Sequence, residues 1–163
     1  MSRSCLTFLL FLATALTGIS DNHAAEPGKP LFDRNWIARS TTAMGVTGDA
    51  RLMPDRITFD GHATFKLRFI AEMAPKKPSL GQLDVDSYSL YEIVDPKPQA
   101  IHNGNHLCGH PKYTRNVPLA RYMAIGLSDN DLLDILVYAR DTPPEDINYS
   151  VQGACGGYNY FTE

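Results

Sequence analysis

The strongest constraint on the fold of this chain is a strict apolar alternation between Ala63 and Ile70. Large apolar and charged side chains take turns there, with Phe65, Leu67 and Phe69 in one set and Lys66 and Arg68 in the other. A period of two is typical of an antiparallel strand that buries one face and exposes the other. Asp60-Gly61 stands just before this segment, and Asp-Gly is the strongest short signal of a hairpin turn. We therefore predict a hairpin that joins a strand at Arg56–Phe59 to this one.

Short segments of the same kind, divided by turn residues, fill the rest of the chain. They lie at Trp36–Arg39, Tyr88–Val94, Arg121–Leu127, Leu132–Ala139 and Ala154–Phe161. No long stretch holds a convincing helical period. Leu132–Arg140 is compatible with a short helix, but its β-branched residues and the turn before it favour a strand. About seven or eight strands at short spacing predict an all-β fold, an antiparallel meander closed into a small barrel or sandwich.

The first segment of the chain, Met1–Ala25, has the layout of a secretory signal peptide. Arg3 gives a positive start, an apolar run of about a dozen residues follows, and small residues end the segment. The run is too short to span a bilayer. Cleavage is expected after Ser20 or after Ala25. Cys5 lies before the apolar run rather than at the cleavage site, so we expect a soluble product without a lipid anchor, in the periplasm or outside the cell.

Beyond residues 1–25, the sequence indicates a leader and one domain. Residues 26–34 contain Pro27, Gly28 and Pro30 and are expected to form a flexible leader, while 35–163 form a single β-domain.

Only two cysteines remain beyond residues 1–25, Cys108 and Cys155. An even pair in an exported protein predicts a disulfide, which in the simplest chain-entropy model contributes roughly 4 kcal/mol. The alternative is a reactive thiol, but the chain has no Cys-x-x-Cys motif.

Three histidines form the strongest candidate for a functional cluster. His102, His106 and His110 recur every four residues, and on a helix they would share a face that could bind zinc or copper. Asn103-Gly104 and Pro111 break a helix here, however, and a bridged Cys108 cannot serve as a thiolate ligand. A polar loop with solvent-facing histidines is therefore the simpler interpretation, and a metal site on the loop is the alternative.

Several other functions find no matching pattern. The formal net charge is −3 and no basic patch stands out, so a nucleic-acid partner is not expected. Gly-x-Ser-x-Gly, phosphate-loop and dinucleotide motifs are absent, and nothing selects one carboxylate as an acid and another as a base. The acidic run at 129–134 fails as a calcium loop because it lacks the required glycine and has Arg140 at the twelfth position. We interpret it as a hairpin turn with a solvated acid.

Three segments together resemble a known group of proteins. They are Thr42–Asp49 leading to Ile57–Phe59, then Asn103–Gly109, then Cys155–Tyr160. They are similar to segments of small exported β-rich proteins of Gram-negative bacteria that lack an assigned function. The resemblance implies a periplasmic, barrel-like β-domain with one disulfide, and it transfers no catalytic or binding residue.

The expected function is therefore a binding role. We expect a non-enzymatic, exported module that binds a protein or a small ligand and has no cofactor. One alternative is a metal-binding protein that uses the histidine-rich loop for zinc or copper. Another is an inhibitor similar to the periplasmic lysozyme inhibitors, which are also small exported β-barrels with a disulfide; their Ser-Gly-x-x-Tyr binding loop has no counterpart in this sequence.

Overall fold

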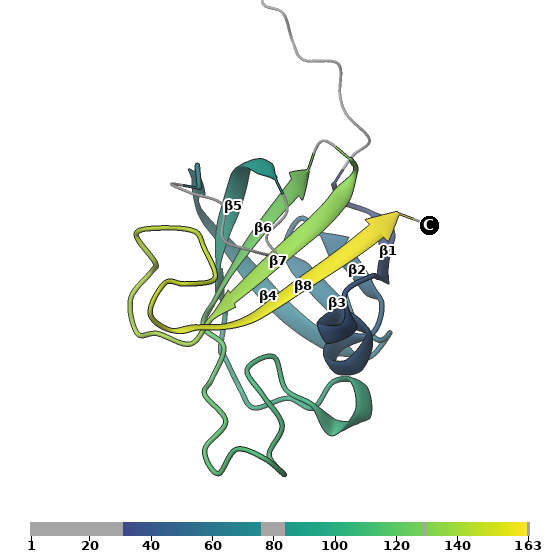
Figure 1. The fold of residues 1–163 in the computed structure, drawn as a ribbon, viewed down its shortest axis with the longest axis vertical. Helices are drawn as coiled ribbons and strands as arrows, with labels where there is room; N and C mark the ends of the chain where they lie inside the picture. The colour runs from purple at the N-terminus through teal and green to yellow at the C-terminus, as the bar shows by residue number, and fades with distance from the viewer. Residues whose placement is uncertain (1–30, 76–83, 129, 163) are drawn as a thin grey trace, which may run out of the picture.

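The computed structural model describes residues 31–75, 84–128 and 130–162, and it shows an all-β protein (Figure 1). Its eight strands are β1 (Arg34–Ala38), β2 (Ala50–Met53), β3 (Arg56–Phe59), β4 (Ala63–Met73), β5 (Val85–Ile93), β6 (Tyr122–Ser128), β7 (Leu132–Tyr138) and β8 (Ala154–Thr162). Each strand pairs antiparallel with the next, and β8 pairs with β1, which closes the barrel. The predicted fold class is thus confirmed, with a barrel rather than a sandwich.

The predicted hairpin forms as expected. Phe59 pairs with Ala63, and both turn residues have left-handed backbone conformations, with φ of 48° at Asp60 and 72° at Gly61. Two short helical turns were not expected: η1 (Ala43–Thr47), which is π-helical, and η2 (His102–Gly104), which is a 3-10 turn. The strand β2 was also missed, because Ala-Arg-Leu-Met has no β-branched residue and forms a strand only by pairing with β1 and β3 on either side.

Alternate side chains of the strands enter two separate apolar clusters. The inner cluster fills the barrel and includes the fully buried Trp36, Phe59 and Tyr160. The outer cluster lies on the other face of β5, β6 and β7, where Ile147 from the 139–153 loop covers it. Its other buried members are Val85, Tyr88, Leu90, Tyr122, Ala124, Leu136 and Tyr138. These three strands are therefore buried on both faces, which explains why their sequences are more continuously apolar than that of β4.

The loops at one end of the barrel are long, and we call this end the loop end. It carries the long connections 39–49, 94–121 and 139–153 together with the short turn 60–62. The connection 94–121 lies below the strands beside η1 (Figure 1). Ile101 and Leu107 of the 94–121 loop are buried in the inner cluster, and Thr47 of η1 forms a buried hydrogen bond of 2.7 Å with the Tyr160 hydroxyl. These segments close the barrel from below.

The N-terminal prediction is only partly within the described residues. The signal segment at 1–25 and the first part of the leader lie outside them. Residues 31–34 of the expected leader do belong to the barrel: Leu31 and Phe32 pack against the inner cluster, and the Asp33 N–H donates to the Leu52 carbonyl at 2.8 Å. Residues 31–34, which lie before the predicted boundary at 35, thus pack with the barrel, because the side chains of Leu31 and Phe32 contact the inner cluster.

Candidate functional site

The disulfide is present at the loop end. Cys108 of the long loop is bonded to Cys155 at the start of β8, with 4.9 Å between the two Cα atoms. The Tyr158 hydroxyl donates a hydrogen bond to the Leu107 carbonyl beside the bridge. The predicted pairing is confirmed, and its structural effect is to hold the 94–121 loop against the last strand.

The three predicted histidines lie on the same loop but make different contacts. His102 Nδ1 is 2.9 Å from Asp60 Oδ2, across the barrel end on the β3–β4 turn. His106 forms a backbone bridge with Gly109. His110 Nδ1 accepts the Lys112 N–H at 2.9 Å.

The pair of His102 and Asp60 gains one further neighbour that the histidine spacing did not indicate. His62 Nδ1 is 3.9 Å from Asp60 Oδ2 and 2.9 Å from the Asp60 carbonyl oxygen. Even so, within 31–75, 84–128 and 130–162 no group of three or more His, Cys, Asp and Glu side chains is arranged to hold a metal ion. The zinc or copper hypothesis stays a prediction, and the arrangement of the histidines adds nothing to it.

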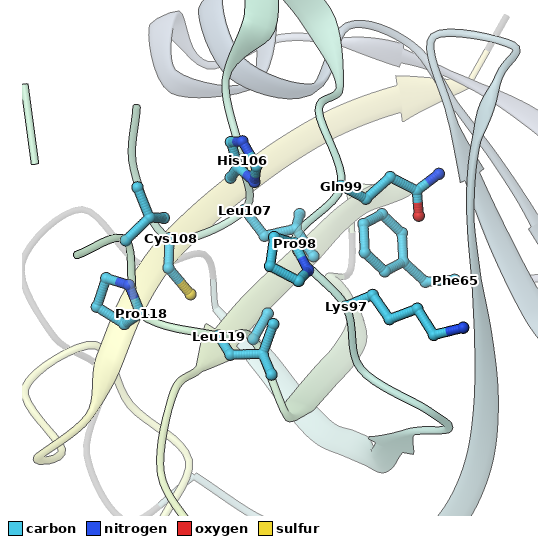
Figure 2. Close-up of a pocket in the computed structure, with 11 residues that line it drawn as sticks. Phe65, Lys97, Pro98, Gln99, His106, Leu107, Cys108, Pro118 and Leu119 are labelled. Carbon is cyan, nitrogen blue, oxygen red and sulfur yellow. The ribbon is translucent and has the colours of Figure 1, made fainter. Parts of the chain in front are cut away.

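A small hollow lies beside the disulfide (Figure 2). His106, Leu107 and Cys108 form one of its sides, and the segment from Lys97 to Gln99 forms another, with Phe65 of β4 beside Gln99. Its volume is about 20 Å³, which is room for about one water molecule. This hollow is therefore too small for an organic ligand.

The barrel interior is occupied by side chains. Trp36, Phe59, Met123, Tyr158 and Tyr160 are each at most 1 % exposed and belong to the inner cluster. An eight-stranded barrel is just wide enough for side chains to fill it, or for one small ligand when they do not. In this barrel the side chains take that space.

A buried carboxyl on the outer face was missed by the sequence analysis. Asp134 of β7 is 1 % exposed, and it accepts hydrogen bonds from the Tyr88 hydroxyl at 2.5 Å and from Asn159 Nδ2 at 2.7 Å. Burial raises the pKa of Asp134 to about 6, and the two hydrogen bonds oppose that rise. The expectation of a solvated acid was wrong at this position, because the outer cluster covers the middle of β7. The signal that could have indicated it is the apolar run on both sides of Asp134.

The wall formed by β2, β3 and β4 presents cations to solvent. Arg51, Arg56, Lys66 and Arg68 are all exposed residues of these strands. One open hollow on this wall is lined by Arg51 with Asn35 and Thr58, and a second by Lys66 with Lys97. Thr58 and Thr64 share a hydrogen bond of 2.9 Å on the wall and line one hollow each. The alternation in the sequence predicted that Lys66 and Arg68 face solvent. It did not indicate that they share a wall with the cations of β2 and β3.

Within the described residues, the upper half of β4 has one edge without a strand partner. β4 has 11 residues, whereas β3 has 4 and pairs only with the first part of β4, between Ala63 and Lys66. Above that, Leu67 N–H donates to the Asp55 carbonyl at 2.8 Å, and no strand in the described part of the chain pairs with this edge any further. Phe69 and Ile70 on this stretch are 53 % and 38 % exposed. The alternation predicted a buried Phe69, but β3 ends too early to cover it.

Comparisons of the chain with protein-family models, with curated proteins and with solved structures find no match. In the described ranges, no helix has both the length and the apolar character needed to cross a bilayer.

Proposed function

We propose that the protein is a non-enzymatic binding module whose partner is a polypeptide rather than a small ligand held inside the barrel. One observation carries this proposal: the barrel interior is filled by its own aromatic side chains, while Phe69 and Ile70 are exposed beside an unpaired strand edge. Main-chain groups and apolar side chains that are accessible together are what an extended polypeptide can use. A small ligand needs a concave pocket that encloses it, whereas the hollow beside the disulfide holds only about 20 Å³. The two hollows on the cationic wall are larger, about 600 Å³ and 240 Å³, but they are open to solvent.

The titratable groups with the most strongly raised pKa values are too deeply buried to support a catalytic role. Burial raises the pKa values of Asp134, Tyr138, Tyr158 and Tyr160. All four side chains are at most 1 % exposed, inside or beside the two apolar clusters. A substrate would have to displace the packing to reach them, so we assign them to the stability of the barrel.

Export remains part of the proposal. The Cys108–Cys155 disulfide supports it, because such bonds persist in oxidising compartments and are rare in the cytosol. The signal-like sequence of residues 1–25 points the same way. Together they favour a module that meets its partner in the periplasm or outside the cell.

Photo-crosslinking tests the polypeptide partner. A photoreactive phenylalanine analogue is placed at Phe69 or at Tyr113, an aromatic residue that is 78 % exposed on the loop at the opposite end. Each protein is irradiated with an extract of exported proteins from the source cells, and any partner captured is purified and its affinity measured. A partner that binds the purified module reversibly and in a fixed ratio supports the proposal.

Two results would overturn it. One is a small molecule that the purified protein converts with turnover. The other is a small molecule that binds stoichiometrically and raises the melting temperature, while neither photoreactive position captures a protein that binds again after purification.

A further inference from the structure

We infer that the unpaired edge of β4 takes an extended polypeptide strand, which runs antiparallel to β4 in line with β3 and presents an apolar side chain to Phe69 and an acidic side chain to Arg68. This inference rests on the proposed function and adds the place of binding and the chemistry of the partner.

The backbone of β4 sets the direction of the hydrogen bonds. The Leu67 N–H points to the β3 side, where it donates to the Asp55 carbonyl at 2.8 Å, and the Lys66 carbonyl points to β5, where it accepts the Val94 N–H at 2.9 Å. Because successive backbone groups of a strand alternate in direction, those of Phe69 point to the β3 side again. No described strand reaches them there. An added strand would pair with these groups, as in other cases of strand addition to a sheet edge.

The inner face of this edge is apolar at Phe69, whereas further along β4 it carries Glu72, which accepts a hydrogen bond of 2.6 Å from the Ser89 hydroxyl. The Phe69 ring packs against the Tyr91 ring, with 5.9 Å between centroids and an angle of 73°. Tyr91 belongs to the inner cluster, so Phe69 faces the barrel side, yet it remains 53 % exposed. A residue placed opposite Phe69 would therefore cover its open side, and a large apolar side chain would remove the most apolar surface from water.

The outer face of this edge is cationic. Arg56 of β3 pairs with Lys66 of β4, so a strand that extends the line of β3 places its next outward side chain opposite Arg68. Arg56 is bound to Asp55 at 3.2 Å and Arg68 is bound to Glu92. Lys66 has no ion pair within the described residues. The three cations of this face thus outnumber the two carboxylates that pair with them. An acidic side chain opposite Arg68 would neutralise the remaining positive charge, whereas a basic side chain would be repelled.

The edge also carries features that discourage indiscriminate pairing. The β4–β5 register shifts between Phe69 and Ala71, which is a bulge, and the charged Arg68 and Glu72 flank it. Bulges and charges on edge strands limit association with arbitrary partners. We therefore expect the edge to select a complementary strand.

Designed peptides test the inference with the full mature protein. The probe is a fluorescent decapeptide in which Glu alternates with Val, and its counterpart alternates Lys with Val. Fluorescence anisotropy should show the Glu-Val peptide binding at least about tenfold more tightly, since a tenfold change corresponds to about 1.4 kcal/mol. When Glu lies opposite Arg68, the backbone amide of the neighbouring Val pairs with Phe69, so N-methylation of the Val amides should abolish binding. N-methylation of the Glu amides, which point away from β4, should leave binding unchanged.

Variants of the protein give the second arm. R68E should reverse the preference in favour of the Lys-Val peptide, and F69S should weaken both peptides at least about tenfold. R115E and Y113S, which change an exposed charge and an exposed aromatic ring on the distant loop, are the matched controls and should bind like the wild type. Circular dichroism verifies that each variant is folded.

The outcomes separate this inference from the proposed function. Equal binding of the Glu-Val and Lys-Val peptides, no binding of either up to millimolar concentration, or no effect of Val N-methylation overturns the inference. If a partner captured by photo-crosslinking binds R68E and F69S like the wild type, the function stands and the edge is not its site. If no polypeptide binds at all, both fall.

Discussion

The Tyr88 hydroxyl donates a hydrogen bond of 2.5 Å to Oδ2 of Asp134 across the strand that separates them. Tyr88 lies on β5 and Asp134 on β7, and each pairs with Gly126 of β6. Asn159 of β8 extends the row with its bond to the other carboxylate oxygen. Side chains of β5, β7 and β8 are thus linked in one network on the outer face, which crosses β6 at Gly126 in the region that the 139–153 loop helps to bury.

This network predicts an unusual dependence of stability on pH. The pKa of Asp134 rises from 3.8 to about 6 on folding, so the folded protein holds the proton more tightly than the unfolded chain. The free energy of unfolding should therefore fall as pH rises from about 4 to about 6, by about 3 kcal/mol, and this contribution should be level above that range. Urea unfolding across this pH range checks it, with D134N as the comparison. A wild-type profile that runs parallel to that of D134N would contradict the assignment.

Gly126 should not tolerate a side chain. A Cβ atom there would lie 2.5 Å from Val85 Cγ1, 2.9 Å from Tyr88 Cδ1 and 3.0 Å from the Ser87 carbonyl oxygen. We expect G126A to destabilise the fold by roughly 1–3 kcal/mol, because the Tyr88 ring has to move and its bond to Asp134 weakens. Chemical denaturation measures this. G45A is the control, since nothing lies within 4 Å of a Cβ at that glycine, and equal stabilities of the two variants would refute the prediction.

The buried hydrogen bond between Thr47 and Tyr160 should couple η1 to β8. T47V leaves the Tyr160 hydroxyl unpaired in the core and should lower the free energy of unfolding by roughly 1–3 kcal/mol. Y160F leaves the Thr47 hydroxyl with its second partner, the Ala43 carbonyl at 3.1 Å, so it should cost less. The double variant should be more stable than the sum of the two single effects indicates, as a double-mutant cycle would show. Strict additivity would mean that the bond contributes nothing.

Removal of the disulfide should lower the local stability of the loop end more than that of the barrel strands. The bridge joins residues 47 positions apart, and replacement of both cysteines by serine should lower stability by about 2–5 kcal/mol. Hydrogen exchange should accelerate first in the 94–121 loop, while β6 and β7, buried on both faces, keep their protection. Uniform acceleration across loop and strands would show that the loop is not an independent unit.

The local pattern of the chain was sufficient for much of the fold. Strict alternation at 63–70, the Asp-Gly turn and the β-branched segment after Asp131 all correspond to observed strands and turns. The cysteine pairing followed from composition, since only two candidates remained beyond residues 1–25. These features are predictable because side-chain period and turn chemistry act over a few residues and do not depend on distant parts of the chain.

Only the tertiary structure decided which strands face each other and how far they overlap. The strand β2 exists because β1 and β3 pair with it, and Phe69 is exposed because β3 is shorter than β4. Asp134 is buried because Ile147 and other residues distant in sequence cover the outer face of β7. Burial of a position and the pairing of an edge depend on long-range contacts, and the period of a strand carries no information about the length of its neighbour. The exposure of Phe69 and the open edge of β4 therefore arise only in the assembled barrel.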